Sequence, residues 1–210
     1  MNDAALGDLQ GPAGNTYDKY ETRNPVARKL VARFLHELDA QVRWSGAATV
    51  LDVGCGEGIG TVRMARVLPE ARVVGLDVPA PGLLDHWKVR GEERPEFVAG
   101  SAYELPFEDG SFDLVTAIEV FEHLERPARA LEEMARVSRR GLLLSVPWEP
   151  VWRGVNMAAG RYVKSYGNTP GHINHWSKKA FAELVGRRFD VRSVHSPFPW
   201  TMVAASVRSS

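Results

Sequence analysis

The stretch Val50-Leu51-Asp52-Val53-Gly54-Cys55-Gly56-Glu57-Gly58-Ile59-Gly60 decides how this 210-residue chain folds. A short run rich in β-branched residues, 48–53, leads directly into closely spaced glycines, and the apolar spacing of a helix follows over 59–68. Such glycines let backbone N–H groups approach a ligand with no Cβ in the way. The N-terminus of the following helix favours a negative group, such as a carboxylate or a phosphate. The stretch therefore predicts a strand, a ligand-binding turn and a helix.

Strands and helices alternate outward from this stretch. Upstream, Asn24-Pro25 has the form of an N-cap followed by proline at the first helical position, and that helix is expected to end near Trp44. Downstream, the expected strands are 72–76, 95–99, 112–118 and 141–146, and the expected helices are 80–90 and 127–137. Continuous apolar strands between amphipathic helices are typical of a parallel α/β sheet covered on both faces, with right-handed crossovers.

The pattern changes after Val146. Residues 147–176 have no clear period and are rich in Trp, Gly, Asn and Pro, which makes them too long for a plain connection. We interpret this segment as a substrate cap. Ser177 then reads as the N-cap of a last helix, and two strand-like runs follow at 189–195 and 202–208. We expect residues 1–210 to form one domain, preceded by a loose tail at its N-terminus.

Composition excludes several classes of function. Lys+Arg and Asp+Glu both number 26, so the net charge is zero, whereas a protein that binds nucleic acid usually has a basic excess. The one cysteine cannot form an intrachain disulfide, which fits a reducing, cytoplasmic location. No uncharged apolar run approaches the roughly 20 residues that span a bilayer, and the N-terminus lacks the pattern of a secretory signal. We expect a cytoplasmic protein without a membrane span or a nucleic-acid partner.

The glycine motif does not match the two common phosphate-binding motifs. Read as G-x-G-x-x-G from Gly54 or from Gly56, its third position is Ile59 or Thr61, and no lysine follows the glycines. Instead, an acidic residue, Asp52, stands two positions before the first glycine. A carboxylate there would repel a pyrophosphate but would accept hydrogen bonds from an ammonium group. The motif therefore predicts a ligand that carries a cationic amine.

A second carboxylate sharpens this prediction. Asp77 closes the next strand, where an acidic side chain can bind both hydroxyls of an adenosine ribose. An amine beside one strand end and a ribose beside its neighbour describe S-adenosylmethionine.

With these residues in place, segment 50–146 resembles the class I S-adenosylmethionine-dependent methyltransferases, in particular the small-molecule branch of the type 11 kind. The resemblance is carried by LDVGCGEG at 51–58, the strand-end Asp77, LPFEDGSFDLV at 105–115 and IEVFEHL at 118–124. It implies a doubly wound, Rossmann-like α/β fold. The implied sheet has seven strands, mostly parallel with a C-terminal antiparallel strand, and helices on both faces.

The resemblance also implies cofactor-binding positions. Asp52, Gly54 and Gly56 would surround the methionyl amine and carboxylate, with Cys55 contributing backbone. The ribose and adenine positions would be Asp77, Val78, Ser101 and Ala102, where Ser101 replaces the family's usual aspartate. Ile118 and Glu119 would line the methionyl chain. In the N-terminal segment 1–23, Tyr17 resembles tyrosines that fold over the cofactor, although it could equally be an aromatic anchor for the first helix.

Candidates for acid–base chemistry are few, and a base is needed only where the acceptor must lose a proton. His123 follows Glu119 by four residues, on an expected helical face just beyond strand 112–118. His172 and His175 precede the last helix, and we favour His172 for the pocket and His175 as a support of the helix start. Two histidines three residues apart are also compatible with a metal. No metal site is expected, however, because no second cluster of Cys or His follows them.

The cap is rich in aromatic residues, which favours a largely apolar acceptor site, although many of them are expected to form the cap's own core. These residues are Trp148, Trp152, Tyr162, Tyr166 and Trp176. The leading hypothesis is S-adenosylmethionine-dependent methylation of a small organic acceptor at oxygen, nitrogen or carbon, as in secondary-metabolite, quinone or glycolipid biosynthesis. A non-catalytic S-adenosylmethionine-binding protein is the alternative. A nicotinamide-dependent reductase is disfavoured by the failed dinucleotide motif.

Overall fold

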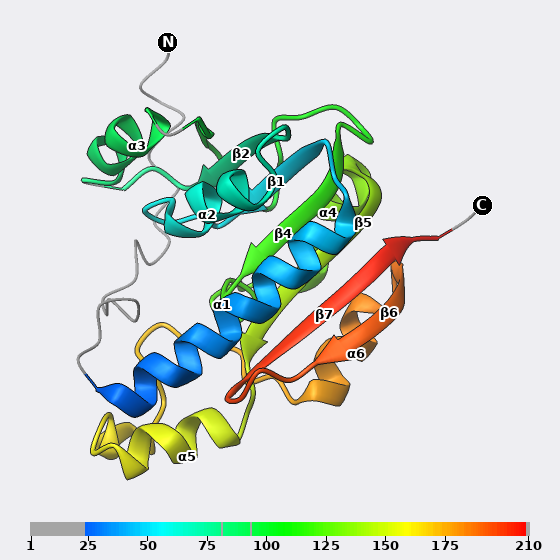
Figure 1. Ribbon diagram of the computed structural model, residues 1–210. Coiled ribbons are helices and arrows are strands. Elements are labelled where there is room, and N and C mark those ends of the chain that lie inside the picture. Colours follow the sequence, from blue (N-terminus) through cyan, green and yellow to red (C-terminus); the bar gives the residue numbers. More distant parts are fainter. Residues whose placement is uncertain (1–23, 81, 93, 209–210) are drawn as a thin grey trace, which may run out of the picture.

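Helices and strands alternate along the chain in the computed structural model, which describes residues 24–80, 82–92 and 94–208 (Figure 1). The helices are α1 (Pro25–Ser45), α2 (Ile59–Val67), α3 (Leu83–Gly91), α4 (Pro127–Val137), α5 (Val151–Ala158) and α6 (Lys178–Val185), with a 3-10 turn, η2 (Val163–Ser165). The strands are β1 (Thr49–Val53), β2 (Arg72–Asp77), β3 (Glu96–Ala99), β4 (Phe112–Ile118), β5 (Ser138–Pro147), β6 (Phe189–His195) and β7 (Trp200–Val207).

The seven strands form one sheet in the order β3-β2-β1-β4-β5-β7-β6. Strands β1 to β5 run parallel to one another, whereas β7 runs antiparallel to both β5 and β6. The predicted fold class is therefore confirmed. The reversed β7 inserted between β5 and β6 also departs from the all-parallel order typical of dinucleotide-binding sheets, which counts against the reductase alternative.

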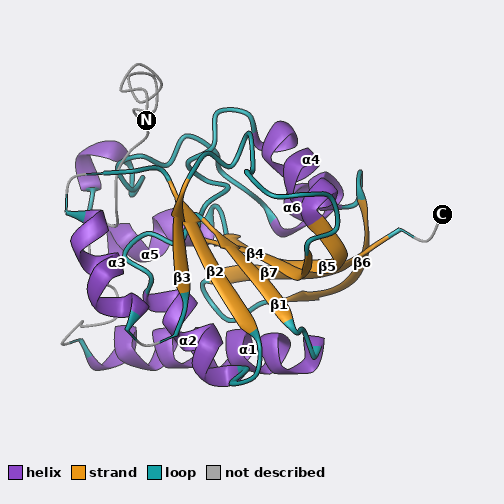
Figure 2. Cartoon of the chain, turned by 90° about the horizontal axis from the view of Figure 1, so that it is seen from above, coloured by secondary structure: helices purple, strands orange, loops and turns teal. Residues whose placement is uncertain are grey.

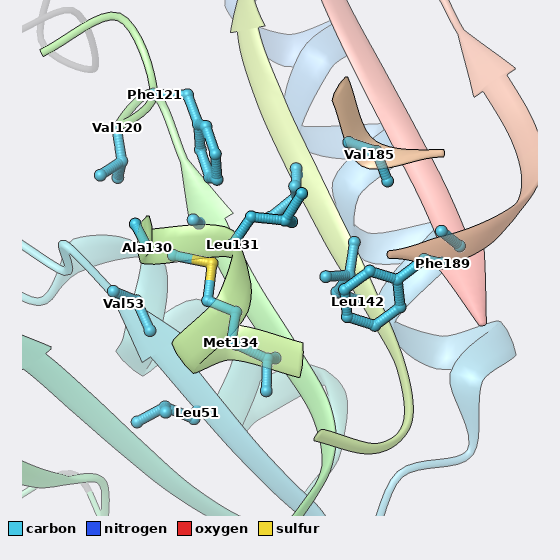
Figure 3. Close-up of a cluster of buried hydrophobic side chains, with 14 of the residues drawn as sticks. Leu51, Val53, Val120, Phe121, Ala130, Leu131, Met134, Leu142, Val185 and Phe189 are labelled. Atoms are coloured by element: carbon cyan, nitrogen blue, oxygen red, sulfur yellow. The ribbon is translucent and has the colours of Figure 1, made fainter. Parts of the chain in front are cut away.

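Two hydrophobic layers cover the sheet, with α1 and α2 on one side and α4 and α6 on the other (Figure 2). On the α4 side, Leu131 and Met134 pack against Leu51 and Leu142 of the sheet, and all four side chains are buried (Figure 3). Because both faces are covered at the centre of the sheet, β1, β4 and β7 are buried along most of their length, whereas the edge strand β6 alternates buried and more exposed residues. This burial leaves the ends of the strands as the places where polar groups meet solvent.

The helix ends follow the expected capping rules. The Asn24 side chain accepts hydrogen bonds from the backbone N–H groups of Val26 and Ala27, which satisfies donors that have no partner within the helix. Gly46 ends α1 in the left-handed conformation, with φ of 55°. The Ser177 side chain caps α6 by accepting from Ala180 N–H. Within the described ranges, the helices are all too short or too polar to cross a membrane.

The segment 147–176, which we call the cap, is more ordered than its sequence pattern indicated. It contains α5 and the η2 turn. Asn156 and Trp152 on α5 donate hydrogen bonds to the loop that follows, at the Gly167 carbonyl and the Thr169 hydroxyl. Short-range hydrogen bonds between side chains and loop backbone therefore build this unit, and they leave little trace in hydrophobic periodicity.

Candidate functional site

A turn built on three left-handed glycines connects β1 to α2. Gly54, Gly56 and Gly58 have φ of 73°, 54° and 84°, a region that costs other residues energy because of their Cβ atom. The turn is fixed to the neighbouring strand, since the backbone N–H groups of Gly54 and Cys55 both donate to the Leu76 carbonyl, at 2.7 and 3.1 Å. The glycine loop therefore lies against the carboxyl end of β2, as the sequence predicted.

The three glycines have different surroundings. A Cβ on Gly54 would lie 2.5 Å from a methyl of Val120, and one on Gly58 would lie 2.5 Å from the Phe97 ring. A Cβ on Gly56 would meet nothing within 4 Å. Packing thus accounts for two of the glycines, whereas Gly56 borders open space that a ligand could fill.

Asp77 lies directly against this open position. Its carboxylate accepts a hydrogen bond from the Gly56 N–H at 2.6 Å and another from the Val78 N–H at 2.7 Å. Burial raises the pKa of Asp77, while these two N–H groups and the nearby His123 lower it. Each carboxylate oxygen has further lone pairs, so Asp77 can accept hydrogen bonds from a ligand while it holds the loop.

Asp52 lies deeper, beneath the loop, and is almost fully buried. The hydroxyls of Thr61 and Thr116 each donate to one of its carboxylate oxygens at 2.8 Å. The register of β1 with β4 places Thr116 beside Asp52. The pKa of Asp52 is raised to about 6, chiefly by burial and also by the charge of Asp77, while the hydrogen bonds from the two hydroxyls oppose this rise. A cationic ligand group near both carboxylates would relieve this repulsion.

Cys55 contributes its backbone to the loop. Its thiol is largely buried, and burial together with the charges of Asp52 and Asp77 holds its pKa far above the usual range. The thiol therefore stays protonated and is a poor nucleophile.

The end of β3 adds the next group of predicted residues. Gly100 N–H donates to the Asp77 carbonyl, and the Ser101 hydroxyl accepts from the backbone N–H of Tyr103. Ser101 thus begins a turn beside Asp77 and retains its own hydroxyl proton for a further partner. Ala102 packs against the hydrophobic core.

Sequence reasoning missed Trp87 on α3. Its indole N–H donates to the Gly56 carbonyl at 2.8 Å, and its ring stacks on Phe97 with centroids 5.4 Å apart. Trp87 therefore holds the loop from the side opposite Asp77. Its place in the helical pattern of 80–90 was the available signal, but that pattern does not say what lies across from the indole.

The end of β4 holds Ile118 and Glu119. Glu119 has φ of 62°, an uncommon conformation for a residue other than glycine. Its carboxylate accepts a 2.7 Å hydrogen bond from the Trp200 indole N–H. Since the strand ends there in a left-handed residue, the chain turns sharply at Glu119, toward the cap.

The helix expected around His123 is absent, and this prediction was wrong. Residues 120–123 form a turn closed by a hydrogen bond from His123 N–H to the Val120 carbonyl. The turn nevertheless brings His123 to His172, with ring centroids 5.0 Å apart and nearly perpendicular planes. His175 lies apart from this pair and contacts the Asn168 side chain at 2.9 Å. Of the remaining predicted site residues, Tyr17 lies outside the described residues.

Backbone hydrogen bonds join this turn to the end of the cap. The backbone N–H groups of Ile173 and Asn174 donate to the Glu122 carbonyl, at 2.9 and 3.0 Å. The Asn174 side chain donates to the carbonyls of Phe121 and Leu124. These bonds fix 171–176 to the end of β4, although some fifty residues separate the two segments.

Comparison with known proteins agrees with this geometry. Residues 51–146 match the sequence model of the family described as "Methyltransferase domain". This segment, slightly less than half of the chain, is therefore similar to the methyltransferase domain family. The match begins in β1 and ends in β5, so it includes the glycine loop, Asp77 and the turn at His123.

The curated relatives extend the comparison beyond this domain. The demethylmenaquinone methyltransferase of Lactiplantibacillus plantarum is 39% identical over 150 residues, which cover 69% of this chain and 63% of that protein. The first relatives are matched over 36% to 65% of their own length.

Two crystal structures share the fold at low identity. The magnesium protoporphyrin IX methyltransferase of Synechocystis PCC 6803, with bound SAH, superposes with a TM-score of 0.67 at 19% identity, covering 90% of this chain and 91% of that one. The [4+2]-cyclase SpnF has a TM-score of 0.67 at 17% identity, covering 94% and 88%. Since a cyclase shares the fold of the methyltransferase domain, the fold alone does not decide the reaction.

Proposed function

We propose that this chain transfers the methyl group of S-adenosylmethionine to a small organic acceptor, at oxygen, nitrogen or carbon. The observation that carries the proposal is the meeting of the Gly56 N–H and Asp77 beside open space at the ends of β1 and β2. The family match over 51–146 supports it. S-adenosylmethionine supplies a methyl group already activated by a sulfonium, so the protein's main task is to position the acceptor.

The residues at these strand ends fit the chemically distinct parts of the cofactor. Asp77 has the lone pairs to accept hydrogen bonds from two ribose hydroxyls, and the buried charge of Asp52 favours a cationic amine above it. The Ser101 hydroxyl is suited to the adenine edge. The other proposed cofactor residues are Tyr17, Gly54, Cys55, Gly56, Val78, Ala102, Ile118 and Glu119.

The acceptor is proposed to bind between the cofactor and the cap, beside His123 and His172. Trp152 stacks over His172, with ring centroids 6.5 Å apart, and supplies an apolar wall. Trp176 also packs on Phe181 and Trp152 on Trp200, so these two partly buried aromatics join the cap to the core. We propose that the two imidazoles handle the acceptor's proton where one must be lost.

A curated relative, the net charge and the cysteine content support proposals for the acceptor and for the location of the protein. The relative that methylates demethylmenaquinone makes a demethylated quinol the first acceptor to test. The zero net charge supports a small molecule rather than nucleic acid, and the single cysteine, which cannot form an intrachain disulfide, supports a cytoplasmic location.

Calorimetric titration tests the cofactor proposal, with S-adenosylmethionine, S-adenosylhomocysteine and NADH as ligands. We expect one equivalent of either adenosyl compound to bind and NADH not to bind. Binding of NADH alone would contradict the proposal. Transfer of a labelled methyl group to a panel of quinols, phenols and amines separates an enzyme from a protein that only binds the cofactor.

A further inference from the structure

Two histidines and a glutamate from distant segments converge at the end of β4. A carboxylate oxygen of Glu122 and one ring nitrogen each of His123 and His172 all lie within 4.8 Å of one another. Glu122 and His123 come from the turn after β4, and His172 comes from the cap. Glu122 is 1% exposed and His172 is 8% exposed, whereas His123 is half-buried, so the cluster is partly shielded and remains accessible from the side of His123.

The backbone fixes the tautomer of one of the two imidazoles. Its Nδ1 lies 2.9 Å from the Gly171 carbonyl oxygen, and because a carbonyl only accepts, the Nδ1 of His123 carries the hydrogen. In the neutral ring the lone pair is then on Nε2. A histidine that donates its other N–H to a backbone carbonyl is the usual arrangement around protein-bound metals. Gly171, with φ of 85°, provides the turn that presents this carbonyl.

The surrounding backbone fixes the cluster before any ligand binds. The Glu122 carbonyl accepts from the Ile173 and Asn174 N–H groups, so Glu122 and the cap end share one hydrogen-bonded unit. Trp152 stacks on His172 from the side of α5. Such support keeps donor atoms close without a metal, which lowers the cost of ordering them when one binds.

The donor set identifies the class of ion. A buried carboxylate is costly unless a positive charge compensates it, and a divalent cation held by two neutral imidazoles supplies that charge. Two histidines and one carboxylate form catalytic zinc sites and also the facial sites of iron enzymes, both of which leave coordination positions open. No metal site was expected from the sequence because no Cys or His cluster follows His175. Glu122 and His123 instead precede His175 by about fifty residues.

We propose that Glu122, His123 and His172 bind one divalent transition-metal ion, whose open positions take an oxygen of the acceptor. This inference rests on the proposed function for its acceptor and extends it to a class, hydroxylated compounds that can coordinate a metal. An ion in this position lowers the pKa of a hydroxyl that binds to it. The two imidazoles then assist loss of the acceptor's proton through the ion that they hold, and the released proton passes to solvent water.

The competing interpretation is an ion pair between Glu122 and protonated histidine, which binds no metal. Metal binding to the untagged full chain separates the two. The chain is stripped with EDTA, freed of chelator, and titrated with Co²⁺ by visible absorption and with Zn²⁺ by calorimetry. We expect one equivalent of each to bind. A wild-type chain that takes up neither ion stoichiometrically would overturn the proposal.

Matched variants assign the ligands. Glu122→Gln, which keeps the size of the side chain, and His172→Ala are each expected to weaken binding by at least about tenfold, because a direct ligand is lost. His175→Ala is the control, since His175 lies three residues away and contacts Asn168; its affinity should stay within about twofold of wild type. Equal losses in His172→Ala and His175→Ala would contradict the assignment. Thermal unfolding without metal checks that each variant folds. If His172→Ala does not fold, Glu122→Gln provides the test.

Titration of the same metal-free samples with S-adenosylhomocysteine separates the two proposals. Binding of S-adenosylhomocysteine with no metal uptake overturns the metal site and leaves the cofactor proposal standing. Metal uptake without S-adenosylhomocysteine binding supports the metal site while the methyl-transfer proposal fails.

Discussion

The two ends of the site are built in opposite ways. At β1 and β2, backbone geometry makes the site: left-handed glycines and strand-end carboxylates lie within residues 52–78. At β4, side chains make it, and they come from the turn at 119–124, the cap and Trp200 of β7. The first end suits a charged ligand that contacts the protein backbone. The second depends on side chains from distant segments, and Val120 of its turn also packs against Gly54 of the glycine loop.

The largest expected effect tests the backbone-built end. Gly56→Val is expected to abolish S-adenosylhomocysteine binding, a loss of more than about 100-fold, because its side chain fills the open space against the loop. Gly46→Val is the matched control, since Gly46 has φ of 55°, also has nothing within 4 Å of a built Cβ, and lies at the end of α1. Both variants bear similar strain, measured by thermal unfolding. Equal loss of binding in both would remove the special role of Gly56.

Asp77→Ala is expected to weaken S-adenosylhomocysteine binding by about 1.5–3 kcal/mol, roughly 10- to 150-fold, through lost charge-assisted hydrogen bonds. Glu96→Gln is the control, because Glu96 is also a carboxylate of the sheet but begins β3 at the opposite edge, in an exposed pair with Arg72. Calorimetry reports both affinities. An unchanged affinity in Asp77→Ala would take this residue out of the site.

Asp52 gives a pH-dependent prediction. Its pKa in the folded protein is about 6, above the value of about 3.9 expected in the unfolded chain, so the folded state binds more protons between these values. Stability from this group is therefore complete below the unfolded pKa and is lost as pH rises through 6. At pH 8, Asp52→Asn should raise the free energy of unfolding by about 1–3 kcal/mol and therefore the unfolding temperature. At pH 4.5 the gain in stability should be smaller.

The same substitution should weaken binding of the cationic amine, because the buried negative charge is gone. Thermal unfolding at the two pH values and calorimetry at pH 8 together measure this trade of stability against binding. Asp113→Asn is a contrasting control, since hydrogen bonds and the Arg139 charge lower the pKa of Asp113 and the sign of its effect should reverse. A gain for Asp52→Asn that is equal at both pH values would contradict the argument.

The smallest expected effect concerns Trp87. Trp87→Phe keeps an aromatic ring but loses the indole N–H that donates to the Gly56 carbonyl, and S-adenosylhomocysteine binding should weaken by about 0.5–1.5 kcal/mol, roughly 2- to 10-fold. Trp44→Phe, at a residue 78% exposed on α1, serves as the control and should leave affinity unchanged. No difference between the two variants would mean that the hydrogen bond from Trp87 does not support the loop.

The contrast between the two ends also explains what the sequence revealed. The glycine loop, Asp52 and Asp77 were predictable because each is positioned by its own strand and the turn next to it. The central strands were predictable because burial on both faces leaves long apolar runs, and β6 was predictable from its alternating pattern. The reversed β7 followed from the resemblance rather than from any local pattern.

The remaining features depend on contacts between distant segments. The turn at 120–123 replaced an expected helix because Glu119 is left-handed and Asn174 and Trp176 bind the carbonyls of Phe121 and its neighbours. The pairing of Glu122 with His172 needs the same tertiary contacts. The roles of Trp87 and Trp200, which donate to groups on other elements, could not be derived from helical or strand periodicity.

Hydrogen exchange with and without S-adenosylhomocysteine tests the central claim most directly, because it compares both ends in one experiment. We predict that the ligand slows exchange over 54–58, 77–78 and 100–103. Exchange at 120–124 and 171–176 should already be slow in the free protein, where hydrogen bonds join these segments, and should change little. Slower exchange confined to 120–124 and 171–176, with the glycine loop unaffected, would contradict a cofactor site at the ends of β1 and β2.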